Sequence, residues 1–182
     1  MDRPVRKSNR LKTYDYSAPG AYFVTFCTKG RRCVLSEIVV GAGLAPPSVV
    51  LSPIGQNVEE QILSLPDRFP SLSVDRYVIM PNHVHLLLTI HSTRAEQNMR
   101  EGQAPPLHNN NNNNSVDSIT GTDIRAVMRV LKSQTSRLSG AAPLWQRSYY
   151  DHVVRHEAEY AEIAEYIDGN PARWCEDRFY TQ

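Results

Sequence analysis

The sequence has few lysines and few cysteines, and it lacks a long apolar run. Only four of its twenty basic residues are lysine, and the other sixteen are arginine, whose planar guanidinium suits bidentate contacts with phosphate. The cysteines, Cys27, Cys33 and Cys175, form neither a Cys-x-x-Cys pair nor an even disulfide set, so we expect reduced thiols. No apolar stretch reaches the length of a membrane span, and the N-terminus has no signal-peptide pattern. We therefore expect a cytoplasmic protein with no membrane partner.

Charge is unevenly distributed along the 182 residues, although the net charge is only +1. Residues 1–12 hold five basic side chains against one aspartate, whereas residues 157–168 hold five acidic side chains and no basic one. Such runs are most often solvated surfaces. The basic run is followed by Tyr14 and Tyr16, and interleaved basic and aromatic residues can also follow a DNA backbone and stack on bases. We interpret residues 1–20 as a basic N-terminal arm, with these candidate DNA contacts: Arg6, Lys7 and Arg10.

Hydrophobic periodicity predicts alternating strands and helices in one domain over residues 21–174. The predicted order is a strand at 21–28, a helix from Ile54 stopped by Pro66, strands at 72–80 and 83–90, a helix from Asp123, a strand at 144–155, and a helix from Glu157 to Gly169. This order favours an α+β fold of the ferredoxin-like (RRM-like) class. That fold is an antiparallel sheet with helices on one face, here with a further C-terminal helix.

Two segments of this domain are predicted to be flexible insertions. Residues 40–53 carry too many glycines and prolines for a helix, and we expect a loop with at most a short extended piece. Residues 91–120 include an unbroken run of six asparagines. A segment of such low complexity cannot bury enough apolar surface to order itself. Residues 175–182 are assigned to a C-terminal tail.

The most distinctive stretch is residues 77–90, in which two apolar runs flank a Pro-Asn break. His83 and His85 lie two apart in the second run, and such residues project from one face of a strand. Two adjacent imidazoles can share one metal ion. A histidine beside a core strand is more often a hydrogen-bonded packing residue, so both roles stay open from the spacing alone. A third ligand has to come from elsewhere in the chain.

The helix that begins at Asp123 has an apolar side and a basic remainder. Its apolar side is expected to face the core, which leaves the basic side free to meet a nucleic-acid backbone. The candidate DNA contacts here and in the last strand are Arg125, Arg129, Lys132, Arg147 and Arg155.

Tyr166 and Asn170 lie one turn apart on the flank of the apolar stripe of the last helix, and neither is needed for the core. A divalent metal can polarise a phosphodiester oxygen. A tyrosine can then attack phosphorus, and the covalent phosphotyrosine keeps the energy of the broken bond for a later joining step. The histidine pair, the tyrosine and the arginine-rich surface are together compatible with nicking and rejoining of DNA.

Three motifs, in this order, resemble the bacterial single-tyrosine HUH transposases, and most closely the REP-associated tyrosine transposases. They are Met80-Pro81-Asn82-His83-Val84-His85-Leu86-Leu87, Trp145-Gln146-Arg147-Ser148-Tyr149-Tyr150-Asp151-His152-Val153-Val154-Arg155 and Tyr166-Ile167-Asp168-Gly169-Asn170-Pro171. The likeness spans residues 14–174, apart from the two insertions. It implies a ferredoxin-like catalytic domain that recognises single-stranded or hairpin DNA and cleaves and rejoins it with Mg²⁺ or Mn²⁺. It implies a monomer or a homodimer.

The resemblance also implies roles for individual residues. His83 and His85 match the metal-binding histidines of the family, and Tyr166 matches the nucleophile that forms a 5′-phosphotyrosine. Asn170 stands where the insertion-sequence relatives carry a glutamine as third metal ligand, and a carboxamide oxygen is a plausible ligand for Mg²⁺. Glu162, one turn before Tyr166, is the alternative third ligand.

Other functions fit the sequence less well. A domesticated protein that binds hairpin DNA without strand transfer would not need the intact histidines and tyrosine. A metal-free phosphoesterase would need two His-x-Thr motifs, and only His91-Ser92-Thr93 fits. A zinc deaminase would need a Pro-Cys-x-x-Cys motif, which the sequence lacks. We therefore expect a transposase-like endonuclease in the cytoplasm, associated with the nucleoid when bound to DNA.

Overall fold

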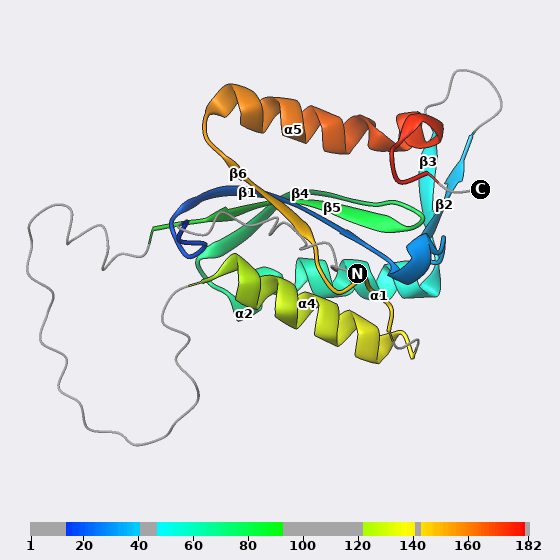
Figure 1. Ribbon diagram of the computed structural model, residues 1–182, viewed down its shortest axis with the longest axis horizontal. Helices are drawn as coiled ribbons and strands as arrows, with labels where there is room; N and C mark the ends of the chain where they lie inside the picture. The colour runs from blue at the N-terminus through cyan, green and yellow to red at the C-terminus, as the bar shows by residue number, and fades with distance from the viewer. Residues whose placement is uncertain (1–13, 41–46, 93–121, 141–142, 181–182) are drawn as a thin grey trace, which may run out of the picture.

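Four antiparallel strands form the central sheet of the protein. The computed structural model describes residues 14–40, 47–92, 122–140 and 143–180, and Figure 1 shows how their elements are arranged. The strands are β1 (Gly20–Cys27), β4 (Leu72–Ile79), β5 (His83–Ile90) and β6 (Tyr150–Val154). Their order across the sheet is β4-β5-β1-β6, so β5 and β1 lie at the centre and pair along their full lengths.

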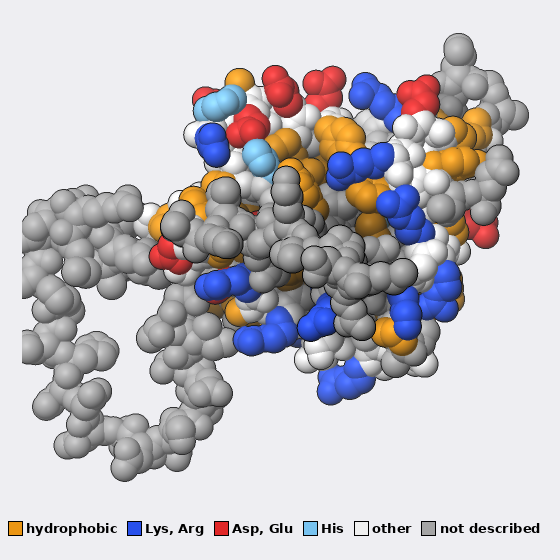
Figure 2. Space-filling view, viewed as in Figure 1, with side chains coloured by type: hydrophobic (Ala, Val, Ile, Leu, Met, Phe, Trp, Pro, Cys, Tyr) orange, Lys and Arg blue, Asp and Glu red, His pale blue; other side chains and the backbone are white. Residues whose placement is uncertain are grey.

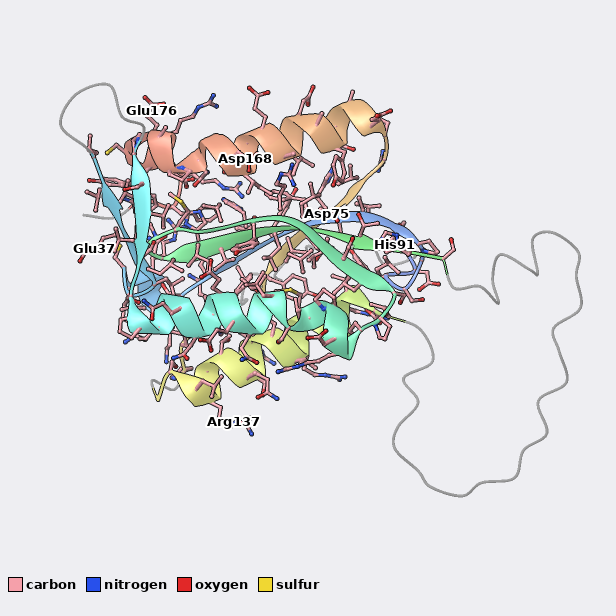
Figure 3. The ribbon with its side chains drawn as sticks, turned by 180° about the vertical axis from the view of Figure 1, so that it is seen from behind. Glu37, Asp75, His91, Arg137, Asp168 and Glu176 are labelled. Atoms are coloured by element: carbon pink, nitrogen blue, oxygen red, sulfur yellow. The ribbon has the colours of Figure 1, made fainter. Side chains whose placement is uncertain are left out.

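Helices cover both faces of this sheet. On one face lie α1 (Pro53–Leu63), α2 (Leu65–Arg68) and α4 (Ile124–Leu138), and on the other lies α5 (Glu157–Gly169), as Figures 1 and 3 show from opposite sides. Short 3₁₀ helices follow β1 and α5, namely η1 (Lys29–Arg31) and η2 (Asn170–Glu176). The order of β1, α1, β4, β5, α4 and β6 is the β-α-β-β-α-β order of ferredoxin-like folds. The predicted fold class is confirmed, and α5 occupies the face that the prediction had not assigned.

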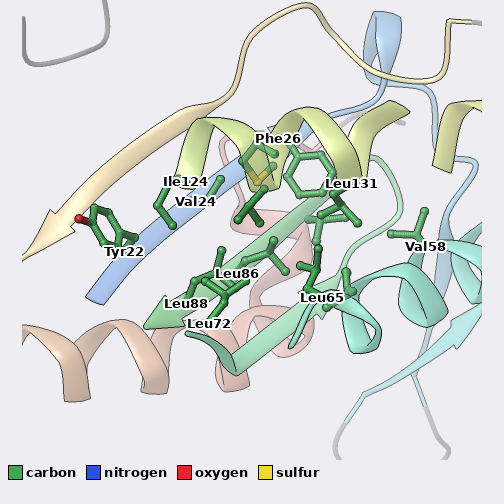
Figure 4. Close-up of a cluster of buried hydrophobic side chains, with 14 of the residues drawn as sticks. Tyr22, Val24, Phe26, Val58, Leu65, Leu72, Leu86, Leu88, Ile124 and Leu131 are labelled. Atoms are coloured by element: carbon green, nitrogen blue, oxygen red, sulfur yellow. The ribbon is translucent and has the colours of Figure 1, made fainter. Parts of the chain in front are cut away.

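The two-residue period of the strands divides the core into two layers. Alternate residues of β1 and β5 face α1 and α4 and are buried in the main core (Figure 4): Tyr22, Val24, Phe26, Leu86 and Leu88. The residues between them face α5, whose Ile167 is buried in a second cluster with Leu87. The odd-numbered residues of β5 therefore lie beneath α5.

Residues 40–53 include the short extended piece that the sequence analysis allowed. Ser48–Leu51 form β3, which pairs antiparallel with β2 (Ser36–Val39) in a separate two-stranded sheet. Residues 41–46 lie outside the described residues. The β-branched Val49 and Val50 favour this strand, but its pairing with β2 could not be predicted from so short a run.

Two predicted element boundaries were wrong. Pro66 does not stop the first helix, because α1 already ends at Leu63 and Pro66 lies in the first turn of α2, where its missing N–H is not needed. The last strand begins at Tyr150 rather than at residue 144. Lys132 Nζ donates to the three carbonyl oxygens of residues 146–148, which are thereby satisfied by the lysine and not by a neighbouring strand.

Several predicted features lie outside the described residues. Arg6, Lys7 and Arg10 of the basic arm belong to this group, and so does most of the asparagine-rich insertion at 91–120. Among the helices that the structure describes, none has both the length and the apolar character needed to cross a membrane.

Gly55, in the first turn of α1, lies where that helix packs closely against the backbone of Leu35. A Cβ atom at Gly55 would overlap the carbonyl oxygen of Leu35, and Leu35 cannot easily move because its N–H and C=O are bonded to Pro81 and Ser52. We predict that Gly55→Ala lowers the free energy of unfolding by about 2 kcal/mol or more in urea denaturation. Gly169→Ala is the control, since open space surrounds that position, and its effect should stay below about 1 kcal/mol. Equal effects of the two substitutions would contradict the prediction.

Candidate active site

His83 and His85 lie side by side at the start of β5, on the face that α5 covers. Both are fully buried, and their Nε2 atoms are 3.0 Å apart. In the register of the sheet they stand opposite Cys27 and Thr25 of β1. Because β5 is held on both sides by neighbouring strands, the backbone fixes the positions of both imidazoles.

Asn82 fixes the tautomer of His83. The Asn82 Nδ2 group donates to the carbonyl oxygens of Phe179 at 2.8 Å and Arg31 at 3.4 Å. Its Oδ1 atom must therefore be the one that faces His83 Nδ1 at 2.9 Å, and an amide oxygen can only accept. His83 Nδ1 thus donates, which leaves the lone pair of neutral His83 on Nε2.

Thr25 allows either tautomer of His85. The Thr25 hydroxyl lies 2.7 Å from His85 Nδ1 and can donate or accept. When it donates, His85 Nε2 carries a proton and can donate it to His83 Nε2. When it accepts, His85 Nε2 presents a lone pair beside that of His83. The second arrangement places two lone pairs 3.0 Å apart and is favourable only with a cation between them.

Burial keeps both imidazoles neutral. It lowers the pKa of His83 to about 4, although Asp177 acts in the opposite direction. It also holds the pKa of His85 well below its ordinary value, with help from His83 and Arg178. Neutral imidazole is the form that binds metals, so both side chains are ready to act as ligands near neutral pH.

Asp177 is the third member of this group, and the sequence analysis missed it. Its Oδ2 atom lies 3.9 Å from His83 Nε2, and its side chain is only 3% exposed. The carboxylate accepts from the backbone N–H of Phe179 at 2.7 Å and from Asn170 Nδ2 at 3.1 Å. A carboxylate this deeply buried beside two neutral imidazoles is stabilised by a nearby positive charge.

One divalent cation fits among these three side chains. One ligand atom of each of His83, His85 and Asp177 lies within 4.8 Å of the other two. Neighbouring ligands of an octahedral Mg²⁺ are about 3.0 Å apart, which matches the separation of the two Nε2 atoms. Asn82 and Thr25 bond the far nitrogens of the two imidazoles, as outer partners of metal-binding histidines commonly do.

The two third ligands considered from the sequence lie near this group but differ from Asp177. Asn170 is buried and donates to Asp177 Oδ2. Its Oδ1 atom has no hydrogen-bond partner among the described residues, so a role of this oxygen as a ligand stays a prediction. Glu162 lines a neighbouring cavity and is not in the group of three.

Tyr166 projects from α5 onto the histidine pair. Its hydroxyl lies 3.3 Å from His85 Nε2, and its ring packs edge-on against Phe23 and His85. Burial raises the pKa of Tyr166, Asp177 raises it further, and Arg178 partly opposes this. The phenol is therefore protonated near neutral pH, and its oxygen lies next to the nitrogen that His85 would present to a cation.

The segment that follows η2 passes over the histidine pair. The Phe179 ring lies 4.7 Å from the ring of His83, and Arg178 and Arg31 each place a guanidinium over Phe179. Arg31 also donates to the carbonyl oxygen of Arg178. Two arginine side chains that the sequence analysis did not single out thus flank the site. No local motif could have found them, because they come from η1 and from beyond η2.

The basic residues predicted to bind DNA lie elsewhere. Arg125, Arg129 and Lys132 belong to α4, on the face of the sheet opposite to α5. Figure 2 shows lysine and arginine side chains gathered over α4 and acidic side chains over α5. Arg125 is paired with Asp123 at 2.6 Å. Arg147 and Arg155, in the loop before β6 and directly after it, are exposed, and a DNA contact by any of these residues stays a prediction.

Comparison with known proteins places the chain in a family. No protein-family model matches it. A Haemophilus influenzae protein described as uncharacterised is 32% identical over 180 residues, which cover 96% of this chain and 93% of that protein. The chain belongs to the same family. This relationship extends over nearly the whole of both chains, so the two proteins share the domain described above.

The fold is also that of a solved DNA-processing protein. A REP-associated tyrosine transposase, solved bound to a REP hairpin, matches this chain with a TM-score of 0.56 and 19% identity, over 90% of this chain and 73% of that one. The fold resemblance predicted from the three sequence motifs is confirmed.

Asp177 can be tested as a metal ligand by direct binding. We predict that Asp177→Asn weakens Mn²⁺ binding by at least about tenfold in isothermal titration calorimetry, because the anionic oxygen is lost while the shape of the side chain is kept. Glu176→Gln is the control, since Glu176 is exposed and lies outside the group. An unchanged Mn²⁺ affinity in Asp177→Asn would remove Asp177 from the site.

Proposed function

We propose that the protein is a metal-dependent single-stranded DNA endonuclease and strand transferase that nicks and rejoins DNA at hairpin sites. The observation that carries this proposal is the 3.3 Å separation between the Tyr166 hydroxyl and His85 Nε2 within one chain. A nucleophile beside a divalent-cation site is the arrangement that phosphodiester transfer requires. Because the tyrosine reaches the histidines of its own chain, a single copy of the protein has all the parts of the site.

The cation would be Mg²⁺ or Mn²⁺, held by His83, His85 and Asp177, and when bound it polarises the scissile phosphate and fixes its orientation. Asn82 and Thr25 position the imidazoles. Arg178 and Arg31 supply positive charge for the phosphate oxygens at the same site.

Tyr166 performs the covalent step in this proposal. The phenolic oxygen attacks phosphorus, the bond from phosphorus to the 3′ oxygen breaks, and the 5′ phosphate stays on Tyr166 as a phosphotyrosine. The phenol gives its proton to water, and the departing 3′ oxygen takes one up. A free 3′ hydroxyl from another DNA end reverses these events and restores a continuous strand without an external energy source.

Hairpin DNA is the proposed substrate on two grounds. The chain shares its fold with a transposase solved in complex with a REP hairpin. The basic side chains of α4 and the arginines beside Phe179 lie on different sides of the sheet. One part of a folded DNA strand can therefore be held while another enters the site. The counterion release from such contacts makes binding strongly salt-dependent.

The nucleophile can be tested with single-stranded oligonucleotides whose inverted repeats fold into a hairpin. We predict that the wild-type protein with Mn²⁺ forms a covalent adduct that survives a denaturing gel. Tyr166→Phe should form none, because only the attacking oxygen is removed, while its hairpin affinity stays within about twofold.

Tyr160→Phe is the matched control, since Tyr160 lies on the same helix and packs in the second core cluster. It should form the adduct at the wild-type level. An adduct with Tyr166→Phe, or its loss in Tyr160→Phe alone, would refute the assignment.

A further inference from the structure

A cavity that Tyr166 helps to line lies between α5 and β6, the strand at one edge of the sheet. Its volume is about 460 Å³, and its walls include Phe23, Tyr150, His152, Glu159, Glu162 and Tyr166. Small-molecule sites in proteins commonly measure about 300–1,000 Å³, so one nucleotide fits. Because Tyr166 forms part of the wall, a group in this cavity is in contact with the proposed nucleophile.

The floor of the cavity is aromatic. Phe23 and His152 stand opposite each other in the register of β1 and β6, and Tyr150 stands opposite Thr25. All of these residues share the sheet face on which His85 lies. Tyr150 is 42% exposed, so its ring does not serve the core. Exposed rings in such positions are the platforms on which single-stranded bases stack.

The two carboxylates of the cavity differ in what they already bind. Glu159 Oε1 lies 2.6 Å from His152 Nε2, and Glu159 Oε2 accepts from the backbone N–H of Arg155 at 2.8 Å. Glu159 thus links the first turn of α5 to His152 and to the backbone just before the helix. Glu162 is exposed and makes no hydrogen bond or ion pair within the described part of the chain, so its carboxylate is open to a ligand.

The basic and the acidic side chains of the cavity lie in different parts of it. Arg178 closes the end next to Asp177 and Phe179, with its guanidinium 5.9 Å from the centre of the Tyr150 ring. The two glutamates lie on α5, away from that end. Carboxylates repel a phosphate but accept hydrogen bonds from the amino groups of bases. A nucleotide therefore fits with its phosphate toward Arg178 and the histidines and its base toward Glu162.

We propose that this cavity binds the base of one nucleotide next to the scissile phosphate and selects a base with an exocyclic amino group, with Glu162 as the acceptor. The proposal rests on the proposed function above. Adenine, cytosine and guanine offer such an amino group, whereas thymine does not. Tyr150 and Phe23 provide stacking that any base can use, so they contribute affinity and Glu162 contributes the choice of base.

A selection from a DNA pool tests this inference. The pool consists of single-stranded oligonucleotides with a randomised stem-loop and randomised flanks, incubated with the full-length protein and Mn²⁺. DNA attached to the protein is then sequenced. For the wild type, amino-bearing bases should exceed thymine by about tenfold at one position flanking the cleaved bond. Glu162→Ala should reduce this preference to within about twofold, and Glu165→Ala, an exposed neighbour outside the cavity, should retain it.

The outcomes separate the two proposals. If the adducts of the wild type and of Glu162→Ala show the same base preference, the inference is overturned and the proposed function stays intact. A complete lack of wild-type adducts would count against the proposed function instead. The Tyr166→Phe protein, selected from the same pool by filter retention, reads base preference without cleavage. A preference there that Glu162→Ala abolishes supports the base pocket, and a preference that persists overturns it.

Discussion

The pairing of β5 with β1 is the constraint on which the candidate site depends. An antiparallel ladder fixes the face to which each residue points, so His83 and His85 lie together beneath α5 while Val84 and Leu86 lie in the main core. A slip of one residue would bury the imidazoles in the apolar layer and expose that layer to α5. The apolar side of β5 therefore stabilises the geometry of its polar side, and core packing and site geometry are inseparable here.

A second layer of hydrogen bonds completes the site. Asn82 holds His83 in one tautomer, and Thr25 accommodates both tautomers of His85. The segment after η2 then returns to the histidines and brings Asp177 against them. Three parts of the chain thus meet at one point, and α5 adds Tyr166 from above. This convergence explains how a small domain can keep two neutral imidazoles, a carboxylate and a phenol close together.

Patterns within short stretches of the sequence predicted the features that depend on local interactions. The apolar periodicity predicted the position of β5, and the asparagine-proline pair predicted where the last helix ends. The two-residue spacing of the histidines predicted that they share a face. Asp177 could not be found in this way, because nothing near it in sequence shows that the chain turns back after Glu176. Glu162 was considered only as a metal ligand, because its place in a cavity depends on how α5 and β6 pack together. The short extended piece at β3 was expected, but its pairing with β2 was not, because glycine and proline surround so short a run.

Binding of one divalent cation between the two imidazoles, beside Tyr166, is the property on which the proposed chemistry depends. Anomalous diffraction from crystals grown with Mn²⁺ tests it most directly. We expect a single strong peak about 2.1 Å from both Nε2 atoms, with Asp177 as a further ligand. A well-diffracting crystal with manganese bound only elsewhere, or with none between His83 and His85, would contradict it.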